Sequence, residues 1–197
     1  MGFEFELKYR ATAQAQSRIL EAYPLDYRQF EMETTYFDTA DFALSDRHIT
    51  LRRRMENGVA VCTVKTPTAG LGRGEWECRS EDIEVGILEL CKLGAPKELL
   101  AYTVNGVRPV CGAKFTRLAG LTEYQGATLE IALDVGILTG GGQEIPLCEV
   151  EVELKSGAPE AAVAFGEHLA LDFGLKTEKK SKFRRALALA KGETHGI

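Results

Sequence analysis

The sequence predicts an α+β fold in which an eight-stranded antiparallel β-barrel with a charged interior forms a tunnel flanked by helices. Eight segments alternate apolar and polar side chains with a period of two, as half-buried strands do. Short turn signals separate several of these segments, which favours antiparallel neighbours. Four further segments place apolar residues at the spacing of an amphipathic helix.

The expected elements follow one another along the chain. Asn57-Gly58 and Gln125-Gly126 are two-residue hairpin turns, whereas we expect a looser connection at the glycines of residues 140–142. Residues 67–74 form a flexible loop, and residues 94–109 form a surface excursion. The strands are expected near residues 3–10, 32–38, 48–56, 59–66, 74–80, 112–122, 127–136 and 146–155, and the helices near residues 12–22, 83–92, 159–171 and 179–190.

Length and composition limit the classes of protein. A chain of 197 residues that is 45% hydrophobic can bury one sizeable core, so we expect a single domain over residues 1–191. Residues 192–197 are expected to be a loose tail, or the point before a further domain. The net charge of -5 argues against bulk nucleic-acid binding, and no apolar run is long enough to cross a membrane. Five cysteines without a C-x-x-C pair predict reduced thiols in the cytoplasm.

Charged side chains gather on one face of the expected strands. Because side chains alternate across a strand, residues two apart share a face. The charged residues that share a face in this way are Glu4, Glu6 and Lys8 in the first strand, Arg52 and Arg54 in the third, Lys65 in the fourth, Glu130 and Asp134 in the seventh, and Glu149, Glu151 and Glu153 in the eighth.

The distribution of sign over these strands points to a ligand. A solvated sheet face would alternate in the same way, but it normally mixes charges so that neighbouring strands attract. Here the first and last strands are rich in carboxylates, and the middle strands are rich in arginine and lysine. Carboxylate clusters suit a hard divalent cation such as Mg²⁺ or Mn²⁺, and arginine clusters suit phosphate oxygens. A metal–polyphosphate complex satisfies both.

Short motifs occur in a fixed order along the chain: Glu4-Phe5-Glu6-Leu7-Lys8, Tyr36-Phe37-Asp38-Thr39, Leu51-Arg52-Arg53-Arg54, Thr63-Val64-Lys65, Arg73-Gly74-Glu75-Trp76-Glu77, Glu130-Ile131-Ala132-Leu133-Asp134, Glu149-Val150-Glu151-Val152-Glu153-Leu154 and Ser181-Lys182. Together they resemble the CYTH domain, or triphosphate tunnel metalloenzyme, family over nearly the whole chain, and most of all its bacterial inorganic triphosphatases. The resemblance implies an eight-stranded tunnel that acts on triphosphates with Mg²⁺ or Mn²⁺. Some relatives carry a second, helical domain called CHAD, which would begin where this sequence stops.

The charge pattern and the resemblance together give each residue an expected role. Catalytic roles are expected for Glu4, Glu6 and Lys65, with Tyr36 and Lys65 as an alternative pair that activates water. Glu75, Glu77 and Glu130 are expected to orient basic side chains. The expected metal ligands are Glu4, Glu6, Asp134, Glu149, Glu151 and Glu153, and the expected phosphate-binding residues are Lys8, Arg52, Arg54, Lys65, Arg73, Arg117 and Lys182.

Plainer interpretations stay open for some of these residues. Arg73 and Lys182 would otherwise form surface ion pairs, worth about 0–1 kcal/mol each, and Glu149 would be an exposed strand-end carboxylate. One position departs from the family pattern: Ala119 stands where relatives often have a second basic residue after Arg117. Lys114 does not replace it, because strand parity places Lys114 on the opposite face.

The expected function is metal-dependent hydrolysis of inorganic triphosphate to pyrophosphate and phosphate. Thiamine triphosphatase, nucleoside triphosphatase and class IV adenylate cyclase are alternatives on the same fold. A non-catalytic polyphosphate-binding module is the alternative of another class, but it would lack a full set of carboxylates. The expected partner is a small-molecule triphosphate, with no nucleic acid and no membrane.

Overall fold

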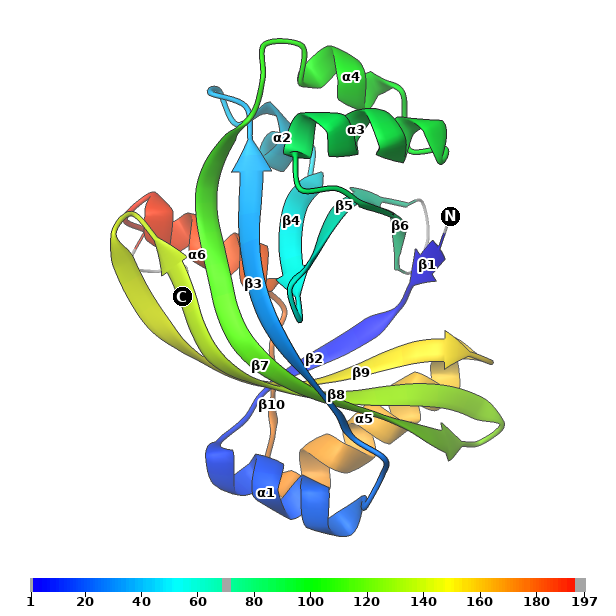
Figure 1. Ribbon diagram of the computed structural model, residues 1–197. Helices are drawn as coiled ribbons and strands as arrows, with labels where there is room; N and C mark the ends of the chain where they lie inside the picture. Colours follow the sequence, from blue (N-terminus) through cyan, green and yellow to red (C-terminus); the bar gives the residue numbers. More distant parts are fainter. Residues whose placement is uncertain (1, 69–71, 194–197) are drawn as a thin grey trace.

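The computed structural model describes residues 2–68 and 72–193 and consists of one large antiparallel sheet with helices against it (Figure 1). The expected tail and the loop of residues 67–74 therefore lie partly outside the described residues. The strands are β1 (Gly2–Glu4), β2 (Glu6–Arg10), β3 (Arg28–Asp38), β4 (Thr50–Glu56), β5 (Val59–Pro67), β6 (Arg73–Arg79), β7 (Arg108–Tyr124), β8 (Ala127–Gly140), β9 (Gln143–Ser156) and β10 (Lys176–Thr177). The helices are α1 (Ala13–Ala22), α2 (Ala43–Asp46), α3 (Ile83–Lys92), α4 (Glu98–Tyr102), α5 (Pro159–Phe173) and α6 (Lys182–Ala190).

The described strands follow the order β1-β6-β5-β4-β3-β7-β8-β9-β2-β10, and each neighbouring pair is antiparallel. All eight expected strands are present, but the first is divided at Phe5 into β1 and β2. Because β1 pairs with β6 and β2 pairs with β9, this segment spans from one end of the sheet to near the other. The expected antiparallel sheet with flanking helices is present and curls strongly (Figure 1). The barrel is not closed, because no described strand pairing joins the two ends of the sheet.

Three short elements were missed because they are too short to show a period. The two-residue β10 pairs with β2. Helix α4 lies within the expected surface excursion. Helix α2 starts where the buried Asp38 carboxylate accepts hydrogen bonds from the backbone N–H groups of Leu44 and Ser45, each 3.0 Å long, which satisfies donors that a helix start leaves open.

The hairpin turns are tight. Asn57 and Gly58 have φ of 47° and 84°, and Gln125 and Gly126 have 49° and 77°, as a hairpin turn with both central residues at positive φ requires. The looser connection expected at residues 140–142 is wrong: β8 ends at Gly140 and β9 begins at Gln143. Gly141 and Gly142, with φ of 59° and 76°, make a third two-residue turn.

Helices cover both apolar parts of the outer face of the sheet. Helices α1 and α5 pack on β2, β8 and β9 through a cluster that includes Ile19, Ile131 and the fully buried Phe165. Helices α3 and α4 pack on β4, β5 and β6 through a cluster that includes Val64 and Leu90. None of the described helices is long and apolar enough to pass through a membrane.

Helix α6 lies on the inner face instead. Its residues Phe183, Ala186 and Leu187 form an apolar cluster with inner-face residues such as Phe115 and Leu138, and the helix contacts β7, β8 and β9 (Figure 1). The charged interior that we expected therefore has one apolar end, and α6 covers it. This placement brings the first residue of α6, Lys182, into the middle of the inner face.

Candidate active site

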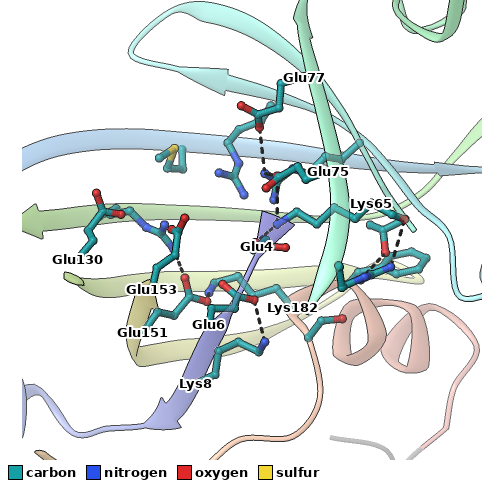
Figure 2. Close-up of a pocket in the computed structure, with 18 of the residues that line it drawn as sticks. Glu4, Glu6, Lys8, Lys65, Glu75, Glu77, Glu130, Glu151, Glu153 and Lys182 are labelled. Atoms are coloured by element: carbon teal, nitrogen blue, oxygen red, sulfur yellow. Dashed lines mark hydrogen bonds and ion pairs between the residues drawn. The ribbon is translucent and has the colours of Figure 1, made fainter. Parts of the chain in front are cut away.

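Charged side chains from most strands converge on one cavity inside the curled sheet. The cavity has a volume of about 340 Å³. Figure 2 shows glutamates and lysines of β1, β2, β5, β6, β8 and β9 pointing into it. Of the residues expected to form the site, those that line the cavity are Glu4, Glu6, Lys8, Tyr36, Arg52, Arg54, Lys65, Arg73, Arg117, Glu151, Glu153 and Lys182. Asp134 and Glu149 are fully buried behind this lining.

Strand β4 supplies a basic wall. Arg54 is buried and donates from Nε to Thr34 Oγ1 at 3.1 Å, and its Nη1 lies 3.4 Å from Glu56. Burial, together with the nearby charges of Arg52 and Arg117, lowers the pKa of Arg54 to about 10. A lowered pKa on an arginine means that its positive charge lacks full compensation. This wall is therefore electrostatically incomplete without an anion.

Arg52 is held more loosely than its position suggests. Its Nη2 lies 3.8 Å from both Glu75 and Glu77 of β6. Within the described residues its buried Nε has no hydrogen-bond partner, although buried N–H groups are normally paired. Glu75 and Glu77 thus lie beside a basic residue, as expected, but they do not satisfy all the N–H donors of the Arg52 guanidinium.

Opposite lies an acidic wall made by β2, β9 and β8. Glu6 is directly opposite Glu153, and Glu153 is directly opposite Glu130, which places three carboxylates in one row. Like charges in such pairs destabilise a sheet. Lys155, which sequence reasoning missed, lies 2.9 Å from Glu153 and 3.3 Å from Glu130. Burial nevertheless raises the pKa of Glu153 despite Lys155, and repulsion from Glu130 and Glu6 adds to it.

Glu4 and Lys65 form the seam between the two walls. They make an ion pair, and Lys65 also lies 3.3 Å from Glu75. Burial raises the pKa of Glu4, Lys65 partly offsets this, and Glu6 and Glu75 raise it further. Tyr36 lines the same cavity but is buried against Phe183, with ring centroids 5.1 Å apart, and burial raises its pKa. Because Lys65 pairs with carboxylates here, the Tyr36–Lys65 pair stays a prediction.

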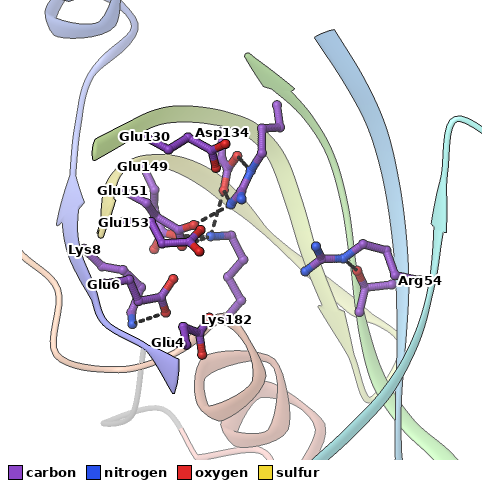
Figure 3. Close-up of polar contacts among 12 residues, drawn as sticks. Glu4, Glu6, Lys8, Arg54, Glu130, Asp134, Glu149, Glu151, Glu153 and Lys182 are labelled. Carbon is purple, nitrogen blue, oxygen red and sulfur yellow. Dashed lines mark hydrogen bonds and ion pairs between the residues drawn. The ribbon is translucent and has the colours of Figure 1, made fainter. Parts of the chain in front are cut away.

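A second charged cluster lies deeper, around Lys182 (Figure 3). The Lys182 Nζ lies 2.8 Å from Asp134, 2.6 Å from Glu149 and 2.6 Å from Glu151. Arg117 donates twice to Asp134, each at 2.7 Å, and also pairs with Glu151. Lys182 and Arg117, expected to bind phosphate, are thus engaged by carboxylates in this structure.

This arrangement decides which carboxylates fit a metal ion. Asp134, Glu149 and Glu151 each offer an oxygen within 4.8 Å of the others, but Lys182, Arg117 and Arg185 already pair with these three carboxylates. Burial opposes ionisation of Glu151, yet Lys182, Arg117 and Lys8 outweigh it and hold its pKa well below the usual range. The cavity-lining row around Glu6 and Glu153 has only Lys8, 2.8 Å from Glu6, and Lys155 as partners. Its oxygen donors therefore fit a hard divalent cation better.

Two residues place Lys182: Ser181, which belongs to the Ser181-Lys182 motif, and Glu178, which the sequence reasoning did not single out. Ser181 caps α6 by accepting from the Arg184 N–H at 3.2 Å, which is the usual role of an N-cap serine. Glu178, just after β10, accepts from Arg10 Nε at 2.5 Å and from the Lys180 N–H at 2.8 Å, and its own N–H donates to the Lys8 carbonyl. No periodic signal marks Glu178, because β10, the strand that it follows, is only two residues long.

Phe115 is a further residue that the sequence reasoning did not single out. Arg54, Arg117 and Lys182 each lie over its ring, at 5.9, 5.8 and 5.4 Å from the centroid. A ring face attracts cations, so Phe115 helps to gather positive charge. Strand parity with Arg117 could have indicated its inward direction. Ala119, two residues from Arg117, lines the cavity as strand parity predicts. Lys114, three residues from Arg117, is exposed on the other face, as expected.

Known proteins resemble this chain in sequence and in fold. An inorganic triphosphatase of Haemophilus influenzae is 28% identical over 169 residues, which are 84% of this chain but 47% of the relative, so the chain spans about half of that protein's length. Two solved structures are similar: the PH1819 protein of Pyrococcus horikoshii OT3 has a TM-score of 0.63 and 23% identity over 96% of this chain and 99% of that one. HpAC1 of Hippeastrum, which shows a dominant triphosphatase activity, has a TM-score of 0.59 and 17% identity over 98% and 96%. The CYTH domain model matches residues 2–187, and the chain belongs to the CYTH domain family.

Proposed function

We propose that this protein hydrolyses inorganic triphosphate to pyrophosphate and phosphate with the help of Mg²⁺ or Mn²⁺. The observation that carries the proposal is the cavity in which Arg54, whose charge is under-compensated, faces a row of carboxylates. A metal–triphosphate complex supplies the anion that one wall lacks and the cation that the other lacks. The Haemophilus influenzae relative, named an inorganic triphosphatase, supports this choice of substrate.

The basic residues would hold the substrate. Arg52 and Arg54 offer forked N–H donors that match phosphate oxygens, and Lys8, Lys65 and Arg73 extend the positive charge along the cavity. Because the Nε of Arg52 has no partner among the described residues, binding phosphate there removes an existing cost. These groups also stabilise the charge that develops on the phosphoryl oxygens in the transition state.

Glu6 and Glu153 would hold the divalent cation. When bound, such an ion neutralises phosphate charge and polarises the phosphoryl group. Glu4, expected among the metal ligands, pairs instead with Lys65. Its raised pKa suits a general base. We therefore assign Glu4 the role of accepting a proton from the attacking water. The water oxygen bonds to the terminal phosphorus, the bond from that phosphorus to the bridging oxygen breaks, and pyrophosphate leaves.

The test is phosphate release from tripolyphosphate, ATP and thiamine triphosphate, each with Mg²⁺, with Mn²⁺ and with EDTA. We expect tripolyphosphate to be preferred and EDTA to abolish release. No release from any substrate, together with tight tripolyphosphate binding, would show a binding module instead.

The Glu6→Gln variant tests the acidic wall. We expect at least a hundredfold loss of kcat, or roughly 3 kcal/mol of transition-state stabilisation, and a higher Mg²⁺ concentration at half-maximal rate. Glu144→Gln, which removes an exposed carboxylate on β9, is the matched control. Unchanged hydrolysis with an unchanged metal requirement in the Glu6 variant would show that this wall is misassigned.

A further inference from the structure

A second cavity adjoins the one inside the sheet. It has a volume of about 860 Å³ and lies beside the start of α6. The two cavities share Lys8, Thr50, Arg73, Ser181 and Phe183 in their linings. Because the two linings share these residues, we call the second cavity the vestibule of the first.

The vestibule is strongly basic although the chain as a whole carries a net charge of -5. Its described lining has two carboxylates, those of Asp46 and Glu193. A concave surface of one sign concentrates ions of the other sign. Against the two carboxylates stand six basic side chains, those of Lys8, Arg73, Lys179, Lys180, Arg184 and Lys191.

His48 holds two of these cations side by side. Its carbonyl accepts a hydrogen bond of 2.6 Å from Arg73 Nη2, and its ring Nδ1 lies 2.8 Å from Arg184 Nη2. Since a guanidinium only donates, Nδ1 is the acceptor. His48 adopts φ of 58°, a left-handed conformation that strains a residue with a side chain. His48 thus positions Arg73 through its backbone carbonyl and Arg184 through its ring.

Neither guanidinium forms a direct ion pair among the described residues. Over residues 2–68 and 72–193, no carboxylate oxygen lies within 4.0 Å of Arg73 or Arg184. Burial lowers the pKa of Arg73, the more distant charges of Glu4, Glu6 and Glu75 only partly offset this, and the charge of Arg184 adds to the lowering. Two neighbouring arginines that repel each other at the mouth of a phosphate-binding cavity form a natural site for another phosphate group.

We propose that Arg73 and Arg184, supported by His48, bind a phosphate group beyond the three in the first cavity, so that the protein accepts linear polyphosphates of four or more phosphates. This inference rests on the proposed function, since it takes the first cavity as the triphosphate site. Arg73 lines both cavities and contacts the chain at the junction. Arg184 lines only the vestibule and contacts the added phosphate.

The experiment compares tripolyphosphate with linear tetrapolyphosphate in the wild type, in Arg184→Ala and in Arg28→Ala. Arg184 and Arg28 are both exposed, and Arg28 stands at the start of β3, far along that strand from Asp38 and the vestibule side. The quantity measured is the ratio of kcat/KM for tetrapolyphosphate to kcat/KM for tripolyphosphate. Association constants for the two compounds, measured by calorimetry in EDTA, give the corresponding binding ratio of tetrapolyphosphate to tripolyphosphate without turnover.

We expect Arg184→Ala to lower both ratios about tenfold, as the loss of one charge-assisted hydrogen bond implies, and Arg28→Ala to leave them unchanged. His48→Gly, which relieves the backbone conformation but removes the ring, should lower them in the same direction. Ratios that stay constant in both vestibule variants overturn the inference.

Two further outcomes separate the sources of phosphate and the two proposals. If Arg184→Ala instead weakens inhibition of tripolyphosphate hydrolysis by orthophosphate while the chain-length ratios stay constant, the vestibule takes free phosphate and the chain-extension proposal is overturned. If no compound is hydrolysed but the binding ratio falls in Arg184→Ala, the proposed hydrolysis fails and the vestibule inference stands.

Discussion

At the scale of single residues, the inner face contains buried charges that lower the stability of the fold and that a ligand would compensate. Arg54 is buried near Arg52 and Arg117, with one hydroxyl and one glutamate as polar partners. Burying a charge costs free energy unless it is fully paired. Residues of this kind are expected where a ligand, rather than the fold, supplies the missing charge.

The Arg54→Met variant should separate these two effects. We expect the free energy of unfolding to rise by about 1 kcal/mol, since replacing an under-compensated buried charge with an apolar side chain of similar length is often stabilising. We also expect KM for tripolyphosphate to rise at least tenfold. Urea unfolding and steady-state kinetics measure the two quantities.

The control is Arg53→Met on the same strand. Arg53 points to the outer side and donates to the Glu81 carbonyl at 2.7 Å, so its loss should leave KM unchanged. A drop in stability for Arg54→Met without an effect on KM would contradict the assignment of Arg54 to substrate.

Glu178 provides a pH-dependent test at the same scale. Burial raises its pKa, but hydrogen bonds from the Lys180 N–H and Arg10, with the charge of Arg185, hold it below the usual 4.5. A carboxylate with a depressed pKa in the folded state stabilises the protein above its unfolded pKa, and this contribution disappears as pH falls through the folded value. Glu178→Gln should therefore cost about 1–3 kcal/mol at pH 7.

The difference in unfolding free energy between wild type and Glu178→Gln should shrink steadily as pH falls below 4.5. Urea unfolding at a series of pH values measures it. The exposed Glu144→Gln variant should differ little from wild type at every pH. A difference that stays constant down to pH 3 would mean that the carboxylate charge does not hold this segment.

At the scale of elements, the hairpin of β8 and β9 positions α6. A Cβ added to Gly140 would lie 2.4 Å from the Ala186 carbonyl oxygen and 2.7 Å from the Ala190 nitrogen. Only a residue without a Cβ allows the helix this close to the sheet. Because α6 carries Lys182 into the carboxylate cluster, the glycine acts on the site through the helix.

Gly140→Ala should destabilise the fold by about 1–3 kcal/mol through overpacking and should also reduce kcat, because α6 must move. Gly142→Ala is the matched variant in the same turn. An added Cβ there meets nothing within 4 Å, but φ is 76°, so it carries backbone strain alone, about 1 kcal/mol. Thermal unfolding and kinetics of both variants check this. Equal losses in both would show that the clash with α6 is unimportant.

At the scale of the whole molecule, the ligand would join two halves of the curled sheet. The basic wall belongs to β4 and β5, and the acidic wall to β2, β8 and β9. At the open side of the curl, the N-terminal segment, divided at Phe5, joins β6 to β9 through β1 and β2. A metal–triphosphate complex bound between the walls should therefore act as a bridge.

We expect tripolyphosphate with Mg²⁺ to raise the melting temperature, with a stabilisation of about 2.7 kcal/mol at a ligand concentration one hundred times Kd. Tripolyphosphate with EDTA should stabilise less, because the carboxylate row then lacks its cation. Differential scanning fluorimetry with Mg²⁺ alone, with tripolyphosphate alone and with both measures the three shifts. A shift with both that equals the shift with Mg²⁺ alone would contradict a shared site.

Local patterns in the sequence predicted the strands, two of the three hairpin turns named above and the charged face. A period of two is a local property, so alternation alone placed Glu4, Glu6, Arg52, Arg54 and Glu151 on the cavity side. The two-residue turns at Asn57-Gly58 and Gln125-Gly126 were equally local. The elements that it missed, such as α2 and β10, are too short to have a period.

Only the tertiary structure decided which charges pair with one another. Whether Asp134 and Glu149 meet a metal or Lys182 depends on how α6 packs against β7–β9, and nothing near these residues in the chain encodes that approach. Similarly, none of the sequence motifs includes His48, but folding places its carbonyl on Arg73 and its ring on Arg184. Electrostatic partners are set by distances between segments far apart in the chain, because charge interactions depend on separation and burial rather than on sequence order.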